Sequence, residues 1–285
     1  PSIQSSIGGC AANAATALAR LEYPVHLCGA VGDDHLGHFL RTGLEREGVD
    51  LKHLSTHAGV PTGVTFVINV EGEDRRFISA MGANDAPWPM KIDGESLVAA
   101  EVVSLHAFGL ARRHDVEDAC RIFQAGRDAG PLTLLDVIVI PGEDLLPQLK
   151  QLLPLVDGFF PNQDEAERLT GLKDPVEAAA KLRDLGARWV VVTCGDRGLV
   201  WDSIEGRGSL DAMVVPSIDA TGCGDAFSAG YIDAHLKGCD PLEKLVRGSV
   251  MGAAAATAAG AIDGLPSRAA FDALHSTWNP TSIIS

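Results

Sequence analysis

A glycine-rich turn at residues 222–224 leads to an acid, Asp225, which precedes an apolar run of small residues. Glycines let the backbone adopt positive φ and let a ligand approach closely. The free N–H groups in the first turn of a helix attract phosphate or a developing oxyanion. Gly222, Cys223 and Gly224 can therefore form an anion hole, with Asp225 beside it as a general base. An ordinary turn in which Asp225 caps the helix explains the same pattern.

A second pair of polar residues, Asn162 and Glu165, follows the short apolar segment 158–160. Ligands of an open parallel sheet bind at the carboxyl ends of its strands, so this position favours a binding role. A spacing of three places an amide and a carboxylate on one side of a helical turn, where both can face a phosphate–metal group. A capping box has the same spacing and explains the pair equally well.

Two other segments combine glycines with polar residues. Thr193, Gly195 and Gly198 follow the β-rich segment 189–193 and form a turn whose backbone can wrap around a nucleotide. A simple hairpin turn explains these glycines equally well. Near the start of the chain a Gly-Gly pair leads into an Ala-rich helix with Asn13 in its first turn. The Asn13 side chain can point out toward a ligand or satisfy the backbone of its own helix.

The order of the apolar segments predicts the fold class. Near-continuous apolar strands separated by amphipathic helices are typical of a parallel sheet covered on both faces, which predicts an α/β protein. β-branched and aromatic residues alternate about a glycine-containing turn within residues 62–80, which predicts a protruding β-hairpin. No linker or internal repeat divides the chain, so we expect one domain over residues 1–285. Strands are expected at 25–31, 102–106, 132–138, 158–160, 189–193, 199–201 and 213–216, and helices within 8–21 and 32–48 and at 116–129, 145–153, 163–169, 175–185, 226–236, 241–259 and 268–275.

The composition excludes several kinds of partner. The 285 residues carry 23 Lys and Arg against 38 Asp and Glu, a net charge of −15, which argues against nucleic acid or an anionic membrane as the main partner. An anionic ligand such as ATP remains compatible, because helix N-termini and metal ions bind phosphate inside acidic proteins. No apolar run is long enough to span a membrane. The six cysteines show no pairing pattern, so we expect buried, reduced thiols in a cytoplasmic protein. No signal peptide is visible, and without an initiator Met we expect an N-terminal piece to be missing.

The motifs follow one another in a specific order: G-G-x-x-x-N, T-G before a hairpin, N-x-x-E, T-x-G-x-x-G, D-x-T-G-x-G-D, and a glycine-ended Ala-rich helix. With this order the sequence resembles the ribokinase-like (PfkB) family of sugar and nucleoside kinases over residues 5–270. The strongest part is D-A-T-G-C-G-D-A-F-S-A-G, followed by G-G-C-A-A-N-A-A-T-A-L-A-R-L. The resemblance implies a ribokinase-like three-layer sandwich with a mostly parallel central sheet, and a small β lid formed by about residues 1–8 and 60–82.

The resemblance also implies a reaction, the ATP-dependent phosphorylation of a hydroxyl of a sugar or sugar-like substrate. Asp225 matches the catalytic base that takes the proton from the attacking hydroxyl. Gly222, Cys223 and Gly224 match the backbone anion hole. Phosphoryl transfer needs positioning and charge stabilisation more than covalent help, and these groups supply both.

The other matched residues are implied to bind the substrates and cations. Gly9 and Asn13 match contacts to sugar hydroxyls, and Glu165 matches the residue that organises Mg²⁺ through water. The ATP site is implied at Asn162, Thr193, Gly195, Gly198 and Thr221. A loop for a monovalent cation, K⁺ in many members, is implied at Asp219, Thr221 and the backbone of Ala255 and Gly260. A homodimer formed through the lid is also implied.

This chain departs from the family pattern at three places. Cys10 stands where ribokinases have a Lys, which argues against ribose as the substrate. Gly264 stands where some members have a Ser ligand, which weakens the case for K⁺ activation. Members normally begin with a strand and a loop whose Asp grips the sugar. Nothing before Gly8 supplies that residue, so we expect it in the missing N-terminal piece.

Three alternatives remain open. A nucleoside kinase of the same family would need aromatic stacking in the lid, where Phe66 and Phe77 are the only aromatic residues. A phosphosugar kinase would need basic residues near the sugar. Those available are Arg75, Arg76, Arg112 and Arg113, for which solvated surface charge is the other explanation. A sugar or nucleotide sensor would need no base at Asp225. A nicotinamide-dependent oxidoreductase is disfavoured, because the turn at 222–227 lacks the third glycine of G-x-G-x-x-G.

Overall fold

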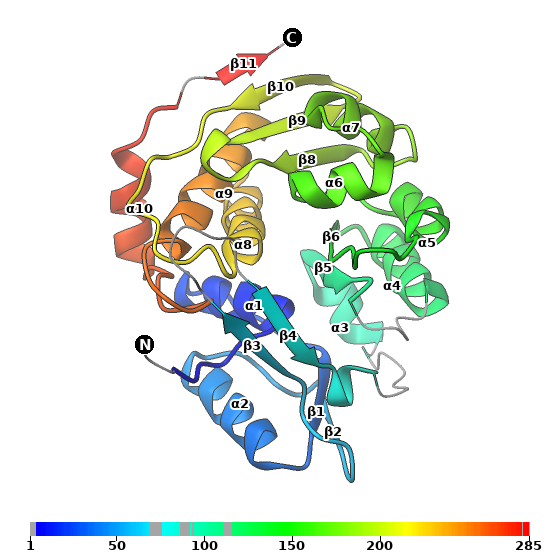
Figure 1. The fold of residues 1–285 in the computed structure, drawn as a ribbon, viewed down its shortest axis with the longest axis vertical. Coiled ribbons are helices and arrows are strands. Elements are labelled where there is room, and N and C mark those ends of the chain that lie inside the picture. Colours follow the sequence, from blue (N-terminus) through cyan, green and yellow to red (C-terminus); the bar gives the residue numbers. More distant parts are fainter. Residues whose placement is uncertain are drawn as a thin grey trace.

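A central sheet organises the protein (Figure 1). The structure is a computed structural model and describes residues 4–68, 76–85, 92, 94–110, 116–280 and 282–284. Within these ranges seven strands form the sheet in the order β11-β10-β9-β8-β7-β6-β5. Four strands run parallel: β5 (Val102–Phe108), β6 (Leu132–Val137), β7 (Gly158–Phe159) and β8 (Trp189–Thr193). Three more continue the sheet antiparallel: β9 (Leu199–Ser203), β10 (Gly206–Leu210) and β11 (Ser282–Ile284).

Helices cover both faces of this sheet and make the three layers (Figure 1). One face carries α1 (Cys10–Arg20), α8 (Cys223–Leu236), α9 (Pro241–Ala255) and α10 (Arg268–Ser276). The other carries α4 (Val116–Ala129), α5 (Leu146–Leu152), α6 (Gln163–Thr170) and α7 (Pro175–Arg183). The predicted α/β fold class with a covered, mostly parallel sheet is confirmed.

The strands show why both faces must be covered. In β8, Val190 and Val192 pack in the core on the side of α4–α7, whereas Val191 packs in the core on the side of α1 and α8–α10. All three side chains are fully buried. Because successive side chains of a strand point to opposite faces, an unbroken apolar run can be buried only between two layers. Burying each valine stabilises the fold by about 1.5–3 kcal/mol.

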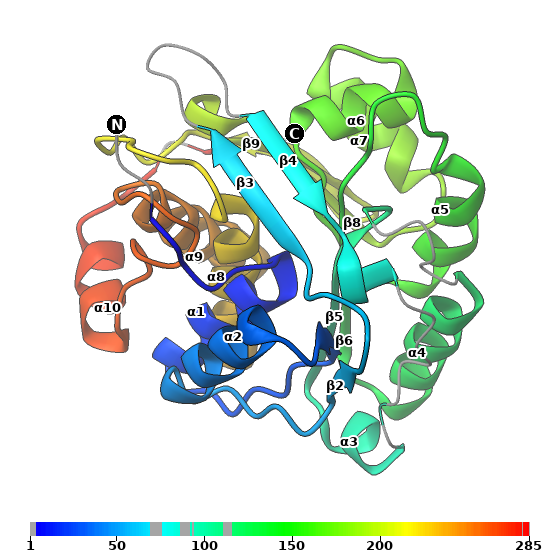
Figure 2. The same ribbon diagram turned by 60° about the horizontal axis from the view of Figure 1, so that its bottom comes forward.

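A hairpin stands apart from the central sheet (Figure 2). It pairs β3 (Val64–Ile68) with β4 (Arg76–Ala80) in antiparallel register, from Val64 opposite Ala80 to Ile68 opposite Arg76. This confirms the predicted hairpin, although its turn at 71–74 lies outside the described residues, as do Arg75, Arg112 and Arg113. The other elements are α2 (His35–Arg46), α3 (Gly94–Ala99), the short 3₁₀ helices Gly82–Asp85, Leu153–Leu155 and Gly195–Arg197, and a two-stranded parallel sheet of β1 (Gly29–Gly32) and β2 (Leu54–His57).

Several predicted elements were wrong in place or extent. Residues 213–216 form no strand, and Val214 is 94% exposed. The antiparallel partner of β9 is instead the glycine-containing segment 206–210, which turns back directly after β9. The strand expected at 25–31 begins only at Gly29, and α9 ends at Ala255, four residues before the expected end.

The state of the cysteines and the absence of a membrane-spanning segment were also predicted from the sequence. All six cysteines are free, as their spacing predicted, but the expectation that they are buried was wrong, because each is only partly buried. In the described ranges, every helix is too short or too polar to cross a membrane.

Candidate active site

The glycine turn at 222–224 begins helix α8. Gly222 is the N-cap of the helix and adopts φ 80°, ψ 0°. A Cβ added there would lie 2.6 Å from the carbonyl oxygen of Ala261, so this position requires glycine for both its conformation and its packing. Asp225 lies in the first helical turn and is buried, with 6% of its surface exposed. The alternative in which Asp225 is the N-cap is therefore wrong.

Free space lies next to this turn. A Cβ added at Gly224 would meet no atom within 4 Å, in contrast to Gly222. The N–H groups of a first helical turn have no acceptor within the helix and attract negative charge. At Cys223 the N–H donates to the carbonyl of Ala220 over 3.3 Å, which is a long hydrogen bond. The start of α8 therefore has the room and the polarity for a phosphoryl group.

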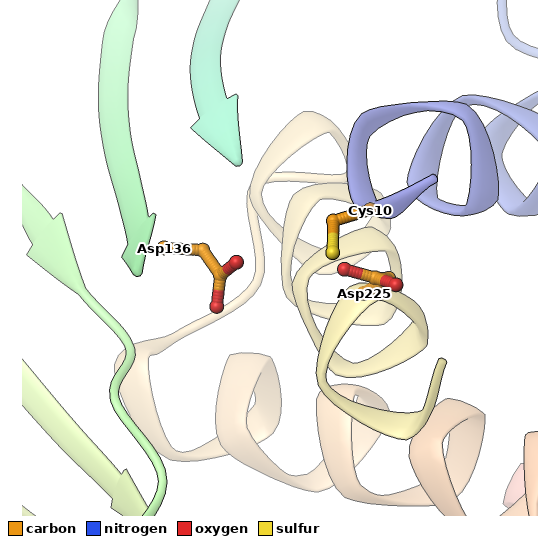
Figure 3. Close-up of side chains that lie close together, drawn as sticks. All are labelled: Cys10, Asp136 and Asp225. Atoms are coloured by element: carbon orange, nitrogen blue, oxygen red, sulfur yellow. The ribbon is translucent and has the colours of Figure 1, made fainter. Parts of the chain in front are cut away.

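Asp225 is held by two neighbours on α1. The Asn13 side chain is buried, and its Nδ2 donates to Asp225 Oδ2 over 2.8 Å. The Cys10 thiol is hydrogen-bonded to the same carboxylate. Figure 3 shows the Cys10 sulfur directed toward Asp225, with Asp136 reaching toward both from the end of β6. Asn13 and Asp225, which were predicted separately as a sugar-binding residue and as the base, are in direct contact although 212 residues apart in the chain.

The acids around Asp225 are poorly solvated. Burial raises the pKa of Asp225 well above its usual range, and the charge of Asp136 raises it further, whereas hydrogen bonds from Asn13 and Cys10 lower it. Burial raises the pKa of Asp136 to about 7. Burial, and then the charge of Asp136, raises the pKa of Glu165 to about 8. Strongly raised carboxyl pKa values gathered in one cleft are typical of functional sites.

Asn162 and Glu165 form a capping box at the start of α6. Asn162 Oδ1 accepts the N–H of Glu165 over 2.9 Å, and Glu165 Oε2 accepts the N–H of Asn162 over 2.8 Å. The structural explanation of this motif is therefore confirmed. The backbone of Asn162 also forms an isolated parallel β-bridge with Thr193 at the end of β8. Two segments that were predicted to bind ATP therefore lie side by side.

The glycines of the 193–198 turn differ from each other. Gly198 adopts φ 84°, and an added Cβ would lie 2.0 Å from the carbonyl oxygen of Leu210, so tight packing against β10 explains this glycine. Gly195 adopts φ 60°, and an added Cβ would meet no atom within 4 Å. The N–H of Cys194 closes the turn on the carbonyl of Gly198 over 2.7 Å. Open space for a ligand therefore lies at Gly195.

The residues predicted to bind a monovalent cation also meet. Asp219 is buried, with 6% of its surface exposed. Its Oδ1 accepts the N–H and the hydroxyl of Thr221 over 2.9 and 2.7 Å, and its Oδ2 accepts the N–H of Gly260 over 3.1 Å. At Gly264 an added Cβ would lie 2.5 Å from the carbonyl oxygen of Ala255, so a serine could not fit there without movement.

Gly9 begins α1 next to the same cleft. It is the N-cap of α1 with φ 109°, and its carbonyl accepts the N–H of Asn13 over 2.8 Å. Gly9, Asn13 and Asp225 all line one large cleft, together with the 193–195 turn and residues of the lid hairpin. Most of the predicted site residues therefore surround a single space, which the hairpin borders.

Sequence reasoning missed two residues of the site. Asp136 lies in β6 and His106 lies in β5, both near the carboxyl ends of parallel strands. The position of these residues at strand ends was the available signal, but neither belongs to a recognisable motif. Cys10 was noted in the sequence only as a departure from the ribokinase pattern, and the structure brings its thiol to Asp225.

Comparison with known proteins decides the family. The sequence model of the pfkB family carbohydrate kinases matches residues 1–268. The chain belongs to this family. The kinase is 29% identical to the ribokinase of Haemophilus influenzae over 271 residues, covering 93% of this chain and 86% of the relative. It is also 29% identical to the 2-dehydro-3-deoxygluconokinase of Bacillus subtilis over 280 residues, covering 92% and 84%.

A solved structure supports the same assignment. The kinase superposes on the ribokinase of Arabidopsis thaliana complexed with ribose and ATP with a TM-score of 0.80, at 26% identity, covering 96% of this chain and 90% of that chain. The predicted family, fold and class of enzyme, an ATP-dependent carbohydrate kinase, are confirmed.

Proposed function

We propose that this kinase transfers the γ-phosphoryl group of ATP to a hydroxyl of a sugar or sugar-like alcohol, with Asp225 as the base. The observation that carries the proposal is a buried carboxylate in the first turn of α8, beside free space at Gly224. A carboxylate whose pKa is raised above its usual range is a stronger base than a fully solvated one. The raised pKa of Asp225 supports this role.

The start of α8 supplies the second requirement, stabilisation of negative charge. The backbone N–H groups of Gly222, Cys223 and Gly224, with the helix dipole behind them, would stabilise the charge that develops during transfer. The Asn13 amide holds Asp225 from the other side and orients its carboxylate. Gly9 and Asn13 together are placed to contact the sugar hydroxyls, because both line the cleft next to Asp225.

Nucleotide and Mg²⁺ are assigned to the opposite wall of the cleft. Thr193, Gly195 and Gly198 would form the turn for ATP, and Asn162 and Thr221 would contact the nucleotide. Among these residues Asn162, Thr193, Gly195 and Thr221 line the cleft. Glu165 would hold Mg²⁺ through water, and its raised pKa indicates a place where a cation lowers the free energy of the ionised acid. When bound, the ion neutralises phosphate charge during transfer.

A monovalent cation is assigned to the loop around Asp219. Asp219 and Thr221 would hold it together with backbone carbonyls of Ala255 and Gly260, and the buried carboxylate is a suitable hard ligand for K⁺. The kinase rate in K⁺ compared with tetramethylammonium tests this assignment. K⁺ activation that is lost in Asp219→Asn would support it, and equal rates in both salts would contradict it.

The substrate is proposed to be a sugar or sugar acid rather than a nucleoside. Relatives that act on ribose and on 2-dehydro-3-deoxygluconate support the class. Stacking of a nucleobase is disfavoured, because the described lid offers two aromatic residues, Phe66 and Phe77, which point to opposite faces of the hairpin and are 64% and 54% exposed. Cys10 in place of a basic residue argues against ribose among the sugars.

A second copy of the chain is proposed to cover the lid. Phe66, Phe77 and Ile78 are 64%, 54% and 61% exposed, and Ile68 is 42% exposed. Exposed apolar groups that lie together on one hairpin are typical of an interaction surface. Pairing of two lids would bury Phe66, Ile68 and Ile78, which share one face of the hairpin, whereas Phe77 points to the other face.

The proposed reaction is tested by ADP release from MgATP in the presence of pentoses, hexoses, keto-deoxy sugar acids, phosphosugars and nucleosides. We expect acceptor-dependent ADP release with one class of sugar or sugar acid, and background release with nucleosides. Asp225→Asn, measured in parallel, should reduce the stimulated rate to near background. Acceptor-independent ADP release with every class, or equal stimulation in parent and variant, would contradict the proposal.

A further inference from the structure

Three potential metal ligands lie close together beside the cleft, which Cys10 and Asp225 line (Figure 3). They are the thiol of Cys10 at the start of α1, the carboxylate of Asp136 in β6 and the carboxylate of Asp225 in α8. One ligand atom from each lies within 4.8 Å of the other two. Three separate elements of the fold therefore direct a sulfur and two oxygen ligands into one small volume.

A fourth ligand is directed into the same place from β5. The side chain of His106 is 3% exposed, and its Nδ1 lies 3.9 Å from Asp225 Oδ1 and 4.0 Å from Asp136 Oδ2. Among the described residues Nδ1 has no hydrogen-bond partner, whereas Nε2 lies 2.9 Å from the hydroxyl of Ser104. A buried polar atom without a partner is costly. A proton on Nε2, shared with Ser104, leaves the Nδ1 lone pair facing two carboxylates, an arrangement that a cation would stabilise.

We propose that Cys10, His106, Asp136 and Asp225 form a binding site for a thiophilic divalent ion such as Zn²⁺, and that the bound ion inhibits the kinase. Tetrahedral Zn²⁺ with bonds of about 2.0–2.3 Å holds neighbouring ligand atoms roughly 3.3–3.8 Å apart. The spacings from His106 Nδ1 to the carboxylates, 3.9 and 4.0 Å, are close to this, so small side-chain movements complete the site. Inhibition follows because Asp225 cannot accept a proton while it ligates a cation.

The donor set selects the kind of ion. Thiolate and imidazole ligands favour Zn²⁺, Co²⁺ and Cu²⁺, whereas Mg²⁺ and K⁺ prefer oxygen ligands alone. This site is therefore distinct from those proposed at Glu165 and Asp219. Binding of the ion releases to solvent the thiol proton of Cys10 and any proton carried by Asp136 or Asp225, and no other covalent bond is broken.

Supporting hydrogen bonds orient most of the ligands, as they do in natural metal sites. The hydroxyl of Ser104 holds His106, and the N–H of Ala107 donates to Asp136 Oδ2 over 3.1 Å. The Asn13 amide donates to Asp225 Oδ2 over 2.8 Å. The ligands are therefore held in place before an ion arrives.

Titration of the full chain with Co²⁺, without ATP or Mg²⁺, tests the binding. We expect one ion per chain, with a near-ultraviolet thiolate-to-cobalt band and visible bands of tetrahedral Co²⁺, both displaced by Zn²⁺. Cys10→Ser should remove the thiolate band, and Cys10→Ser and His106→Asn should each weaken binding at least tenfold. Cys239→Ser is the matched control, because this thiol lies beyond the far end of α8 and should leave binding unchanged. Far-ultraviolet circular dichroism checks that each variant is folded.

Absence of the thiolate band in the folded parent, or affinities of both variants within twofold of the parent, would overturn the proposal. A second arm measures kinase activity at free Zn²⁺ concentrations fixed by a chelating buffer. The parent should be inhibited, with Cys10→Ser at least tenfold less sensitive relative to its own activity without Zn²⁺. Full activity of the parent at Zn²⁺ saturation would contradict the inhibition. Because binding is measured without substrates, loss of the proposed kinase reaction in the acceptor screen would leave the cobalt result intact, so the two failures are distinguishable.

Discussion

The floor of the cleft, formed by His106, Glu165 and Asp225, differs from the lid hairpin of β3 and β4 in how far its side chains are exposed. On the floor, Asp225, His106 and Glu165 are 6%, 8% and 7% exposed, and hydrogen bonds from several elements hold them. In the lid, all five residues of β4 are exposed, and Phe66 and Ile78 are 64% and 61% exposed. Chemistry that needs fixed geometry and weak solvation is therefore built into the floor, whereas the lid keeps apolar groups available for a substrate or a second copy of the chain.

The difference in burial leads us to expect that the floor and the lid control different properties of the kinase. Burial raises the pKa of the acids in the cleft, and fixed dipoles there act without reorganisation, so we expect this region to determine the rate of transfer. The lid has little packing of its own, so its conformation depends on what it covers. Changes on the floor should therefore affect kcat or stability, and changes in the lid should affect KM and association.

The largest effect is expected from the base. Asp225→Asn removes the proton acceptor but keeps the size of the side chain, so kcat should fall by about 10²–10⁴-fold. Steady-state ADP release with the acceptor found in the screen measures this. Asp128→Asn, an exposed acid at the end of α4, is the control and should stay within twofold of the parent. A kcat of Asp225→Asn within a few-fold of the parent would show that another group is the base.

A smaller effect is expected at the start of α8. In Gly222→Ala the new Cβ would lie 2.6 Å from the Ala261 carbonyl oxygen, which displaces the helix start and its N–H groups. Because small displacements of catalytic groups are costly, kcat should fall by about 10–100-fold. Gly238→Ala is a matched control, since Gly238 also has positive φ, 70°, but an added Cβ there meets no atom within 4 Å. Equal losses of kcat in the two variants would indicate backbone strain alone.

The acids of the floor also predict how stability depends on pH. The folded protein keeps protons on Asp136 and Glu165 up to about pH 7 and 8, whereas the unfolded chain loses them near pH 4. The folded state therefore binds more protons between these values, and the free energy of unfolding must fall as pH rises. We expect a decrease of roughly 2–5 kcal/mol between pH 5 and 7 in urea unfolding without ATP or Mg²⁺.

Glu165→Gln sharpens this prediction. Glutamine can keep the capping box with Asn162, so the variant removes the titrating group with little change in structure. Its unfolding free energy should depend less steeply on pH than that of the parent. Glu45→Gln, an exposed acid on α2, is the control and should follow the parent. A parent whose stability is constant or rises from pH 5 to 7 would contradict the raised pKa values.

The smallest effect on activity is expected in the lid. Phe66 and Ile78 lie opposite each other in the hairpin register. The double variant Phe66→Ser, Ile78→Ser should raise the sugar KM by about 3–10-fold, equivalent to about 0.7–1.4 kcal/mol, and leave kcat nearly unchanged. Analytical ultracentrifugation should show a shift from dimer to monomer. Val214→Ser, which replaces an exposed apolar residue outside the lid, is the control. An unchanged KM and an unchanged sedimentation coefficient would exclude both roles of this surface.

Sequence predicted the fold best where the chemical pattern was periodic and buried. The strand Trp189–Thr193 and the helix Val116–Ala129 have the predicted bounds. The strand β10 was missed because G-R-G-S-L has no β-branched residue and depends on pairing with β9. The apolar run at 213–216 failed as a strand because no neighbouring strand pairs with it in the described structure, a condition that local composition does not encode.

The candidate site shows the same division. Motif residues far apart in the chain meet in space, as Asn13 does with Asp225 and Asp219 does with Gly260. Asp136 and His106 were not predicted, because each is a single polar residue in a buried strand and only the register of the sheet brings it to the floor. Local sequence therefore predicts motifs, whereas groups that act through position alone require the fold.

The proposed role of Asp225 as the base is tested most directly by single-turnover phosphoryl transfer, measured by rapid quench at saturating ATP and sugar. Asp225→Asn should transfer about 10²–10⁴-fold more slowly than the parent, with ATP and sugar Kd values within about threefold. The lid double variant should transfer at the rate of the parent once the sugar is saturating. Transfer by Asp225→Asn within a few-fold of the parent, together with a large loss in the lid variant, would place the chemistry in the lid and contradict the role of Asp225 as the base.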